Sequence, residues 1–244
     1  AAATWLRGID WFAFPTTLAG MVDASVGGKT GINSAAGKNL IGSFHSPSAV
    51  FVDLSFLPSL SDRDFSAGLA EVIKTGLISD IEILEILAGL NSIDEVRGAA
   101  YELILRSIAV KASVVSADFK EGKLREILNF GHTLGHAVEK ESEYKLRHGE
   151  AVAIGLGFAL ELSGLMAGLP EIDVERGKAL LLKFGLSVTS PSHKWPVLLE
   201  IMRSDKKARG SRLRFIGISE FGVAEWIESV EDEDLARAYE RIAE

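Results

Sequence analysis

The sequence changes character at about Ser61, and this change limits the folds that the chain can adopt. Before it, apolar runs at 9–14 and 49–53 are typical of short β-strands, and a polar, glycine-rich stretch at 23–39 lies between them. After it, apolar residues recur mostly with helical spacing. We therefore predict an α/β part at residues 1–60 and a mostly helical domain at 61–244.

Ser61 and Asp64 form a helix N-terminal signature with an acid in the first turn. Six further helices are predicted at roughly 80–90, 94–117, 131–142, 148–168, 173–185 and 195–204. Residues 212–218 and 223–228 are expected to form a hairpin, and a charged helix closes the chain. The run at 9–14 is apolar and aromatic, so we expect a buried strand there.

Composition excludes several classes of protein. The net charge of −8 offers no electrostatic case for binding nucleic acid. The longest uncharged apolar run, 151–160, is too short to cross a bilayer, so no membrane span is expected. The chain has no cysteine, which excludes disulfides and thiolate metal sites and fits a reducing, cytoplasmic compartment.

Three of the five histidines, His132, His136 and His148, fall within seventeen residues. The first two are four residues apart and share one face of a helix, and the third opens the next helical stretch. Clustered neutral imidazoles hold divalent metals at neutral pH, and a catalytic zinc needs only three protein ligands. The alternative for an isolated pair is two ordinary helix residues, but a third histidine nearby favours a metal site.

A carboxylate would complete this site, and spacing leaves three candidates open, Glu71, Glu139 and Glu150. Glu71 lies on or near the apolar stripe of its helix, where burying an acid is costly unless it is paired or binds a metal. The alternative for Glu71 is an ion pair with Lys74, one turn further along the helix.

Gly28-Lys29-Thr30 resembles the end of a phosphate-binding loop, but that motif requires glycine where this chain has Asp23. The glycines beside Lys29 still permit backbone amides and an ammonium group to approach an anion. A tight turn explains them equally well. Lys111, Arg125 and Lys206 are each, taken alone, more typical of solvated surface cations than of a site.

Together, these segments resemble the 3-dehydroquinate synthase family. The matching residues are Pro15–Leu18, Val22–Gly31, Gly37–Asn39, Gly68–Lys74, Leu124–His136 and His148–Gly155. They occur in the family's order between Arg7 and about Lys207, so the match does not depend on any single short pattern.

The resemblance assigns roles position by position. It implies that zinc, or cobalt, is bound by Glu71, His132 and His148. The residues implied to surround the substrate are Asp23, Lys29, Lys74, Lys111, Asn129 and His136. Those implied to contact its phosphate and carboxylate are Lys29, Asn39, Arg125 and Lys206. Positions implied to line NAD are Thr16, Thr17, Asp23, Lys38 and Asn39. Arg7 matches an arginine that reaches the neighbouring subunit's site, which implies a homodimer.

The implied activity is a lyase reaction of the shikimate pathway of aromatic amino acid biosynthesis. 3-Deoxy-D-arabino-heptulosonate 7-phosphate, a small anionic sugar phosphate, becomes 3-dehydroquinate through transient oxidation by NAD, β-elimination of phosphate, re-reduction and aldol closure. The implied fold is an α/β remnant of a nucleotide-binding domain followed by a mostly helical, metal-binding domain. We expect most of the family's N-terminal NAD-binding lobe to precede residue 1 in a longer chain.

Four alternatives remain at this point. A cyclase acting on sedoheptulose 7-phosphate tends to differ at positions matching Lys111, Arg125 and His136, which here have the dehydroquinate-type residues. These residues do not exclude a cyclase for an amino-substituted substrate. A metal-dependent polyol dehydrogenase would release NADH, and an inactive fragment would serve only as a dimerisation or binding module.

Overall fold

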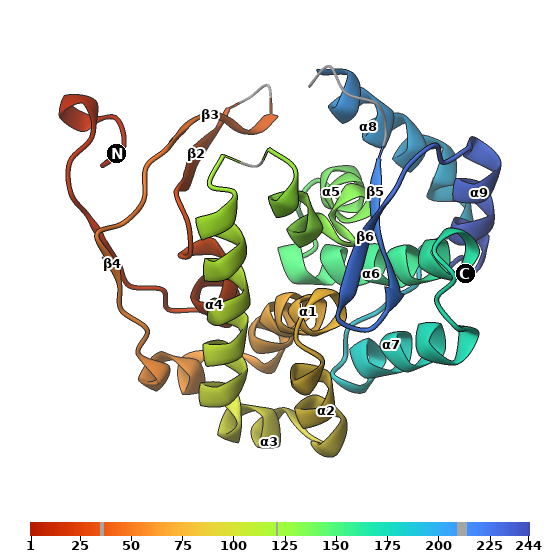
Figure 1. Ribbon diagram of the computed structural model, residues 1–244, viewed down its shortest axis with the longest axis horizontal. Helices are drawn as coiled ribbons and strands as arrows, with labels where there is room; N and C mark the ends of the chain where they lie inside the picture. The colour runs from red at the N-terminus through yellow and green to blue at the C-terminus, as the bar shows by residue number, and fades with distance from the viewer. Residues whose placement is uncertain (35–36, 121, 209–213) are drawn as a thin grey trace.

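A long central helix, α6, organises the protein. The computed structural model describes residues 1–34, 37–120, 122–208 and 214–244, and it leaves the side chains of 33–34, 37–40 and 205–208 undescribed. Helix α6 (His148–Met166) is packed against α1, α5, α7, α9 and β5 (Figure 1). It is long and apolar enough to cross a membrane, but 78% of its apolar stretch is buried inside the protein. This burial identifies it as a core helix.

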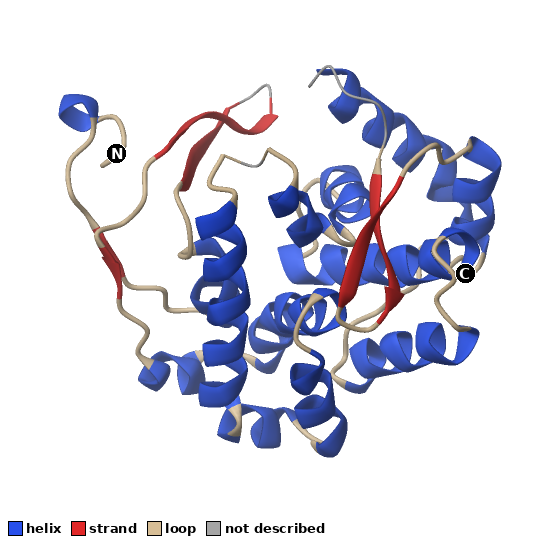
Figure 2. Cartoon of the chain, viewed as in Figure 1, coloured by secondary structure: helices blue, strands red, loops and turns tan. Residues whose placement is uncertain are grey.

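The helices follow the order in which the sequence predicts them, and they dominate the fold (Figure 2). Their bounds are α1 (Asp62–Ile78), α2 (Ile81–Gly89), α3 (Ile93–Gly98), α4 (Ala100–Ala117), α5 (His132–Glu141), α7 (Glu171–Lys183), α8 (Trp195–Ala208) and α9 (Asp232–Glu240). Short helical turns are η1 (Trp5–Arg7), η2 (Gly20–Ala24), η3 (Leu54–Ser59), η4 (Leu124–Asn129) and η5 (Ser192–Lys194). The Ser61 hydroxyl accepts a hydrogen bond from the Asp64 amide at 3.1 Å, which confirms the expected start of α1.

Two apolar clusters share α6. One joins η2, α1–α4 and α7, and the other joins α5, α8, α9 and strand β5. Helix α1 is buried at every position from Phe65 to Ile78, so any polar side chain in this stretch must find its partners inside the protein.

In the described residues, three two-stranded sheets accompany the helices. β1 (Phe12–Ala13) pairs in parallel with β4 (Ala49–Val50), while β2 (Lys29–Ser34) and β3 (Gly37–Phe44) form an antiparallel hairpin. The predicted C-terminal hairpin is present as β5 (Phe215–Glu220) and β6 (Val223–Ile227). The mostly helical architecture after a short α/β part is therefore confirmed.

Two expectations need correction, and one hairpin was not predicted. The run at 9–14 is not a buried strand, because Phe12 and Phe14 are 57% and 63% exposed and only two of its residues pair. The polar stretch at 23–39 contains strand residues of the β2–β3 hairpin. Ile32 and Ile41 pair across this hairpin but remain exposed, so no buried face imposes an alternating pattern on its sequence. The helix expected at 94–117 is two helices that meet at Gly98 and Ala99.

Candidate metal and substrate site

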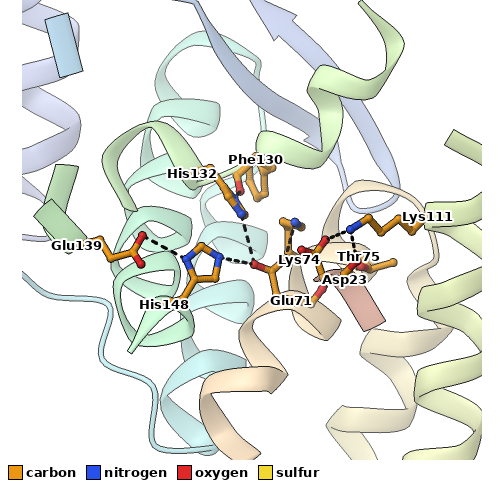
Figure 3. A network of polar contacts seen from close by, with 9 residues as sticks. All are labelled: Asp23, Glu71, Lys74, Thr75, Lys111, Phe130, His132, Glu139 and His148. Atoms are coloured by element: carbon orange, nitrogen blue, oxygen red, sulfur yellow. Dashed lines mark hydrogen bonds and ion pairs between the residues drawn. The ribbon is translucent and has the colours of Figure 1, made fainter. Parts of the chain in front are cut away.

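Helices α1, α5 and α6 bring together three side chains that are far apart in the sequence. Glu71 lies in the middle of α1, His132 is the first residue of α5 and His148 is the first residue of α6. Figure 3 shows the Glu71 carboxylate pointing toward both imidazoles. The possible ligand atoms of this group lie within 4.8 Å of one another.

Close helix packing at two glycines creates this convergence. A Cβ atom on Gly149 would lie 1.7 Å from the Ala67 carbonyl oxygen, so only glycine lets the start of α6 rest on the backbone of α1. Ala67 precedes Glu71 by one helical turn, and His148 is therefore held beside that carboxylate. A Cβ on Gly155 would lie 2.0 Å from the Gly131 carbonyl oxygen, which brings α5 equally close to α6.

The distances fit a tetrahedral ion. Oε1 of Glu71 lies 3.3 Å from Nε2 of His132 and 3.2 Å from Nε2 of His148. Zinc with bonds of about 2.0–2.1 Å holds its ligand atoms roughly 3.4 Å apart. The spacing between the carboxylate and each imidazole therefore matches what zinc requires.

The orientation of His132 supports the same conclusion. Its Nδ1 lies 3.1 Å from the Phe130 carbonyl oxygen, which only accepts, so the network assigns the proton to Nδ1. Nε2 then faces a carboxylate oxygen. This contact is favourable only if a cation, either a proton on Nε2 or a metal, lies between the two atoms. A backbone carbonyl that fixes the tautomer is also the usual outer partner of a metal-binding histidine.

His148 lies between two carboxylates. Its Nδ1 is 3.3 Å from Oε2 of Glu139, which is buried, and its Nε2 faces Glu71. Burial disfavours the charged imidazolium, but the Glu139 and Glu71 carboxylates beside its two ring nitrogens outweigh it and raise the pKa of His148 to about 9. The carboxylate–histidine pair therefore favours a cation at Nε2, either a proton or a metal.

Glu71 is 1% exposed, and neither carboxylate oxygen accepts a hydrogen bond of ordinary geometry from the described residues. Oε2 lies 2.5 Å from Nζ of Lys74, so the ion pair expected along α1 does form, but it is buried. Burial raises the pKa of Glu71, yet Lys74 and His132 more than offset this and hold it well below the ordinary value. Glu71 is thus ionised, and its Oε1, which does not pair with Lys74, faces both imidazoles.

The other two carboxylates considered from the sequence lie elsewhere. Both oxygens of Glu150 accept hydrogen bonds from Arg63, at 2.5 and 2.8 Å. Glu139 forms a second possible metal-binding group with His136 and His148, but His136 is exposed. The buried group of Glu71, His132 and His148 fits zinc better, because the Nε2 atoms of both imidazoles face one charged oxygen of Glu71.

Beyond Glu71, a second ion pair continues the polar network (Figure 3). Nζ of Lys111 on α4 lies 2.5 Å from Oδ1 of Asp23 on η2 and also donates to the Asp23 carbonyl. Burial lowers the pKa of Lys111, and attraction to Asp23 opposes this. Burial and repulsion by Glu71 would raise the pKa of Asp23, but Lys111 and Lys74 lower it below its ordinary value. Taken alone, Lys111 was more typical of a surface lysine, yet it is buried.

Arg125 is also buried rather than a surface cation, since it is 3% exposed. Its Nη1 donates to the Phe119 carbonyl at 2.7 Å, and its Nη2 lies beside Gly27. Gly27 has a φ of +102°, which supports a tight turn in the glycine-rich stretch. Whether this turn also binds an anion stays a prediction.

The remaining predicted residues are distributed more widely. His136 lies beside the metal-binding group, with its ring centroid 5.3 Å from that of His132 and 6.0 Å from that of His148. Asn129 ends η4 and is half-buried, and Lys29 is exposed at the start of β2. Three predicted side chains lie outside the described residues, namely Lys38, Asn39 and Lys206.

The N-terminal residues form no part of this cluster. Arg7, Thr16 and Thr17 are exposed, in the segment that precedes η2. Their roles toward a neighbouring subunit or NAD stay predictions.

Two residues that organise the site were missed or misjudged from the sequence. Glu139 was considered only as a ligand, although it serves as the partner of His148. Asp118 was not considered, although its carboxylate binds three backbone amides next to Arg125. An aspartate at a helix end with a glycine four residues later is a recognisable signal for such a turn.

Comparison with known proteins identifies the family to which this arrangement belongs. The family model described as "3-dehydroquinate synthase N-terminal" matches residues 1–67, and "3-dehydroquinate synthase C-terminal" matches residues 68–208. The 3-dehydroquinate synthase of Streptomyces coelicolor is 49% identical over 245 aligned residues, which cover 100% of this chain and 68% of that relative.

Solved structures of related enzymes share the fold. A 2-epi-5-epi-valiolone synthase from Streptomyces hygroscopicus subsp. jinggangensis, with NAD⁺ and Zn²⁺ bound, superposes with a TM-score of 0.91 at 28% identity, covering 99% of this chain and 68% of that one. A 2-deoxy-scyllo-inosose synthase, complexed with carbaglucose-6-phosphate, NAD⁺ and Co²⁺, gives 0.80 at 30% identity, covering 96% and 65%.

Proposed function

The chain belongs to the 3-dehydroquinate synthase family, and on this premise we propose that the group at α1, α5 and α6 is its zinc-dependent reaction centre. The observation that carries the proposal is the convergence of both imidazole Nε2 atoms on one oxygen of a buried, ionised Glu71. His132, His148 and Glu71 would hold the metal. Zn²⁺, or Co²⁺ in its place, would supply a Lewis acid that lowers the pKa of a substrate hydroxyl.

The substrate would lie between this group and the Asp23–Lys111 pair. Lys74 and Lys111 supply buried positive charge to a substrate that carries a phosphate and a carboxylate. Asn129 ends η4, the element that also carries Arg125, and would donate or accept a hydrogen bond with a substrate hydroxyl. Such fixed charges act strongly because they need no reorganisation during the reaction.

Proton transfer is proposed for His136. It is exposed and lies next to the two histidine ligands, so it would reach a substrate hydroxyl directly or through one water. Arg125, Lys29, Asn39 and Lys206 would bind the anionic ends of the substrate. NAD, contacted by Thr16, Thr17, Asp23, Lys38 and Asn39, would accept a hydride from the substrate and return it within one turnover.

The proposed reaction releases phosphate from 3-deoxy-D-arabino-heptulosonate 7-phosphate and forms 3-dehydroquinate. We propose further that residues 1–60 form part of the NAD-binding α/β domain and residues 61–244 the zinc and substrate domain. The enzyme would act in the cytoplasm as a homodimer, with Arg7 reaching the site of the neighbouring subunit.

The test is phosphate release from this substrate with zinc and NAD supplied, while NADH absorbance is followed in parallel. Each assay would use this chain and a form extended to the full length of its relatives, of which this chain covers 68%. We expect phosphate release that requires both cofactors and leaves no net NADH. Accumulation of NADH in step with product would indicate a dehydrogenase, and turnover of sedoheptulose 7-phosphate instead would indicate a different cyclase. No phosphate release from either form would refute the proposal.

A further inference from the structure

The position of Arg125 depends on a short loop between α4 and η4. The Phe119 carbonyl, within this loop, accepts the hydrogen bond from Nη1, while a Cβ atom placed on Gly27 would lie only 3.1 Å from Nη2. The guanidinium is therefore confined between its own loop and the glycine turn that follows η2. Whatever fixes the loop also fixes the guanidinium.

One side chain closes this loop. Asp118, the C-cap of α4, accepts hydrogen bonds from the amides of Gly122 at 2.7 Å, Lys123 at 2.9 Å and Arg125 at 3.0 Å. These three backbone hydrogen bonds, from Arg125, Gly122 and Lys123, lower the pKa of Asp118 to about 2. The carboxylate is thus charged at all physiological pH values and binds the backbone of Arg125 itself.

The loop is held from both sides by the rest of the molecule. The Phe119 ring packs over Gly28, where a Cβ atom would lie 2.5 Å away, and its centroid is 5.7 Å from that of Phe44 on β3. On the other side, Nζ of Lys123 lies 5.1 Å from the centroid of the Trp226 ring on β6. Through these two side chains, the loop contacts both the β2–β3 hairpin and the β5–β6 hairpin.

We propose that Asp118 is a positioning residue for substrate binding, which binds the backbone amides of Gly122, Lys123 and Arg125 and so holds the Arg125 guanidinium at the Gly27 turn. The inference rests on the proposed function, in which Arg125 contacts an anionic end of the substrate. The hydrogen bonds that Asp118 accepts from the described residues come from backbone amides, so it would act through Arg125.

A carboxylate is required because three N–H groups converge on its two oxygens. Asparagine has nearly the same shape but offers one acceptor oxygen, and its NH₂ group would face the donors that it must bind. Asp118→Asn should therefore lose at least one of the three hydrogen bonds and loosen the loop without changing the volume of the side chain.

The experiment is a double-mutant cycle in the zinc- and NAD-loaded enzyme that is active in the phosphate-release assay. The variants are Asp118→Asn, Arg125→Ala and both together. Asp80→Asn is the matched control, because Asp80 also accepts a backbone hydrogen bond at a helix end and pairs with Arg106 away from this loop. For each variant kcat, KM, zinc content and Tm are measured.

We expect Asp118→Asn to raise KM on the order of tenfold, with a smaller change in kcat and stoichiometric zinc. In the Arg125→Ala background, the same substitution should raise KM no further, because residues that act through one another are not additive. Asp80→Asn should leave KM unchanged.

The results separate the two proposals. If Arg125→Ala raises KM but Asp118→Asn leaves it unchanged, or if the two effects add, the positioning role is refuted and the proposed function stands. If Arg125→Ala itself leaves both KM and kcat unchanged, Arg125 is not a substrate contact and its part of the proposed function fails.

Discussion

The metal-binding helices and the N-terminal segment differ most in how their side chains are enclosed. Around Glu71, every residue of α1 from 65 to 78 is buried, and the surrounding helices meet at glycines. In the N-terminal segment, Phe12, Phe14 and Ile32 are all more than half exposed. The first region sets its geometry by packing within the described chain. The second displays apolar surface, although parallel pairs such as β1 and β4 are normally covered on both faces.

This difference leads us to expect that metal binding depends on α1, α5 and α6, and that it is insensitive to the N-terminal strands. The positions proposed for NAD lie in the exposed segment, so NAD binding should depend on that segment. The predictions below test this contrast, beginning with the largest expected effect.

His148→Ala should abolish both zinc binding and activity, because it removes one of three ligands and leaves Glu71 buried beside the gap. Zinc content is measured by metal analysis after dialysis. His136→Ala is the control: its side chain belongs to the alternative group with Glu139, and we expect it to retain stoichiometric zinc while losing activity. Retention of zinc by His148→Ala would refute the ligand assignment, and loss of zinc in His136→Ala would favour the alternative group.

Gly149→Ala should destabilise the fold by about 3 kcal/mol, the upper end of typical overpacking costs, because the new methyl group meets a backbone carbonyl that cannot rotate away. Zinc affinity should fall with it, since α6 must move away from α1. The control is Gly89→Ala, also in a helix, where no described atom beyond the adjacent residues and nearby backbone of its own helix lies within 4 Å of the added group. It should stabilise the protein by less than about 1 kcal/mol. Equal changes in the free energy of unfolding for Gly149→Ala and Gly89→Ala, measured with urea, would show that the close contact is unimportant.

Glu139→Gln should weaken zinc binding by about 10- to 100-fold, the usual cost of changing the outer partner of a histidine ligand. The amide still accepts a hydrogen bond from His148 but lacks the charge that strengthens it. Competition with a chelator measures the affinity. Glu141→Gln, on the same helix but paired with Lys194 at 2.6 Å, should bind zinc as the unmodified protein does. An unchanged zinc affinity in Glu139→Gln would mean that the charge of Glu139 does not contribute to zinc binding.

The stability contributed by Asp118 should depend on pH in a defined direction. Its pKa is about 2 in the folded protein and about 3.9 in an unfolded chain, so the folded state favours the charged form. The stability difference between the unmodified protein and Asp118→Asn should be complete above about pH 4–5 and disappear as the pH falls toward 2. Urea unfolding at several pH values measures it. A difference that stays constant with pH would contradict this role of the charge.

The smallest effect is expected in the exposed hairpin. Ile32→Thr should change the free energy of unfolding by less than about 0.5 kcal/mol, since this side chain is 57% exposed. Leu134→Ala in α5, where the side chain is 1% exposed, should cost about 2–5 kcal/mol. Comparable losses at both positions, measured by urea unfolding, would show that the hairpin is covered in solution and would remove the contrast between the regions.

Much of the helical part was predictable because its sequence periodicity reflects burial on the inside of the fold. The cap at Ser61, the helix at His148 and the final hairpin lie close to where the sequence places them. The β2–β3 hairpin was missed because its apolar residues are exposed and carry no alternating signal. The break at Ala99 was missed because apolar residues continue through it with helical spacing.

The sequence by itself determined the kinds of ligand available, three clustered histidines without any cysteine, and it placed them on helices. Residue spacing left three carboxylates open, and Lys111 and Arg125, taken alone, resembled ordinary surface cations; only the family resemblance singled out Glu71, Lys111 and Arg125. The tertiary structure distinguished the carboxylates physically, by placing Glu71 against both imidazoles, Glu150 against Arg63 and Glu139 behind His148. Periodicity along a helix fixes the face on which a residue lies. The partner that the residue meets there depends on how closely two helices approach, which periodicity does not specify. Here Gly149 against Ala67 set that approach.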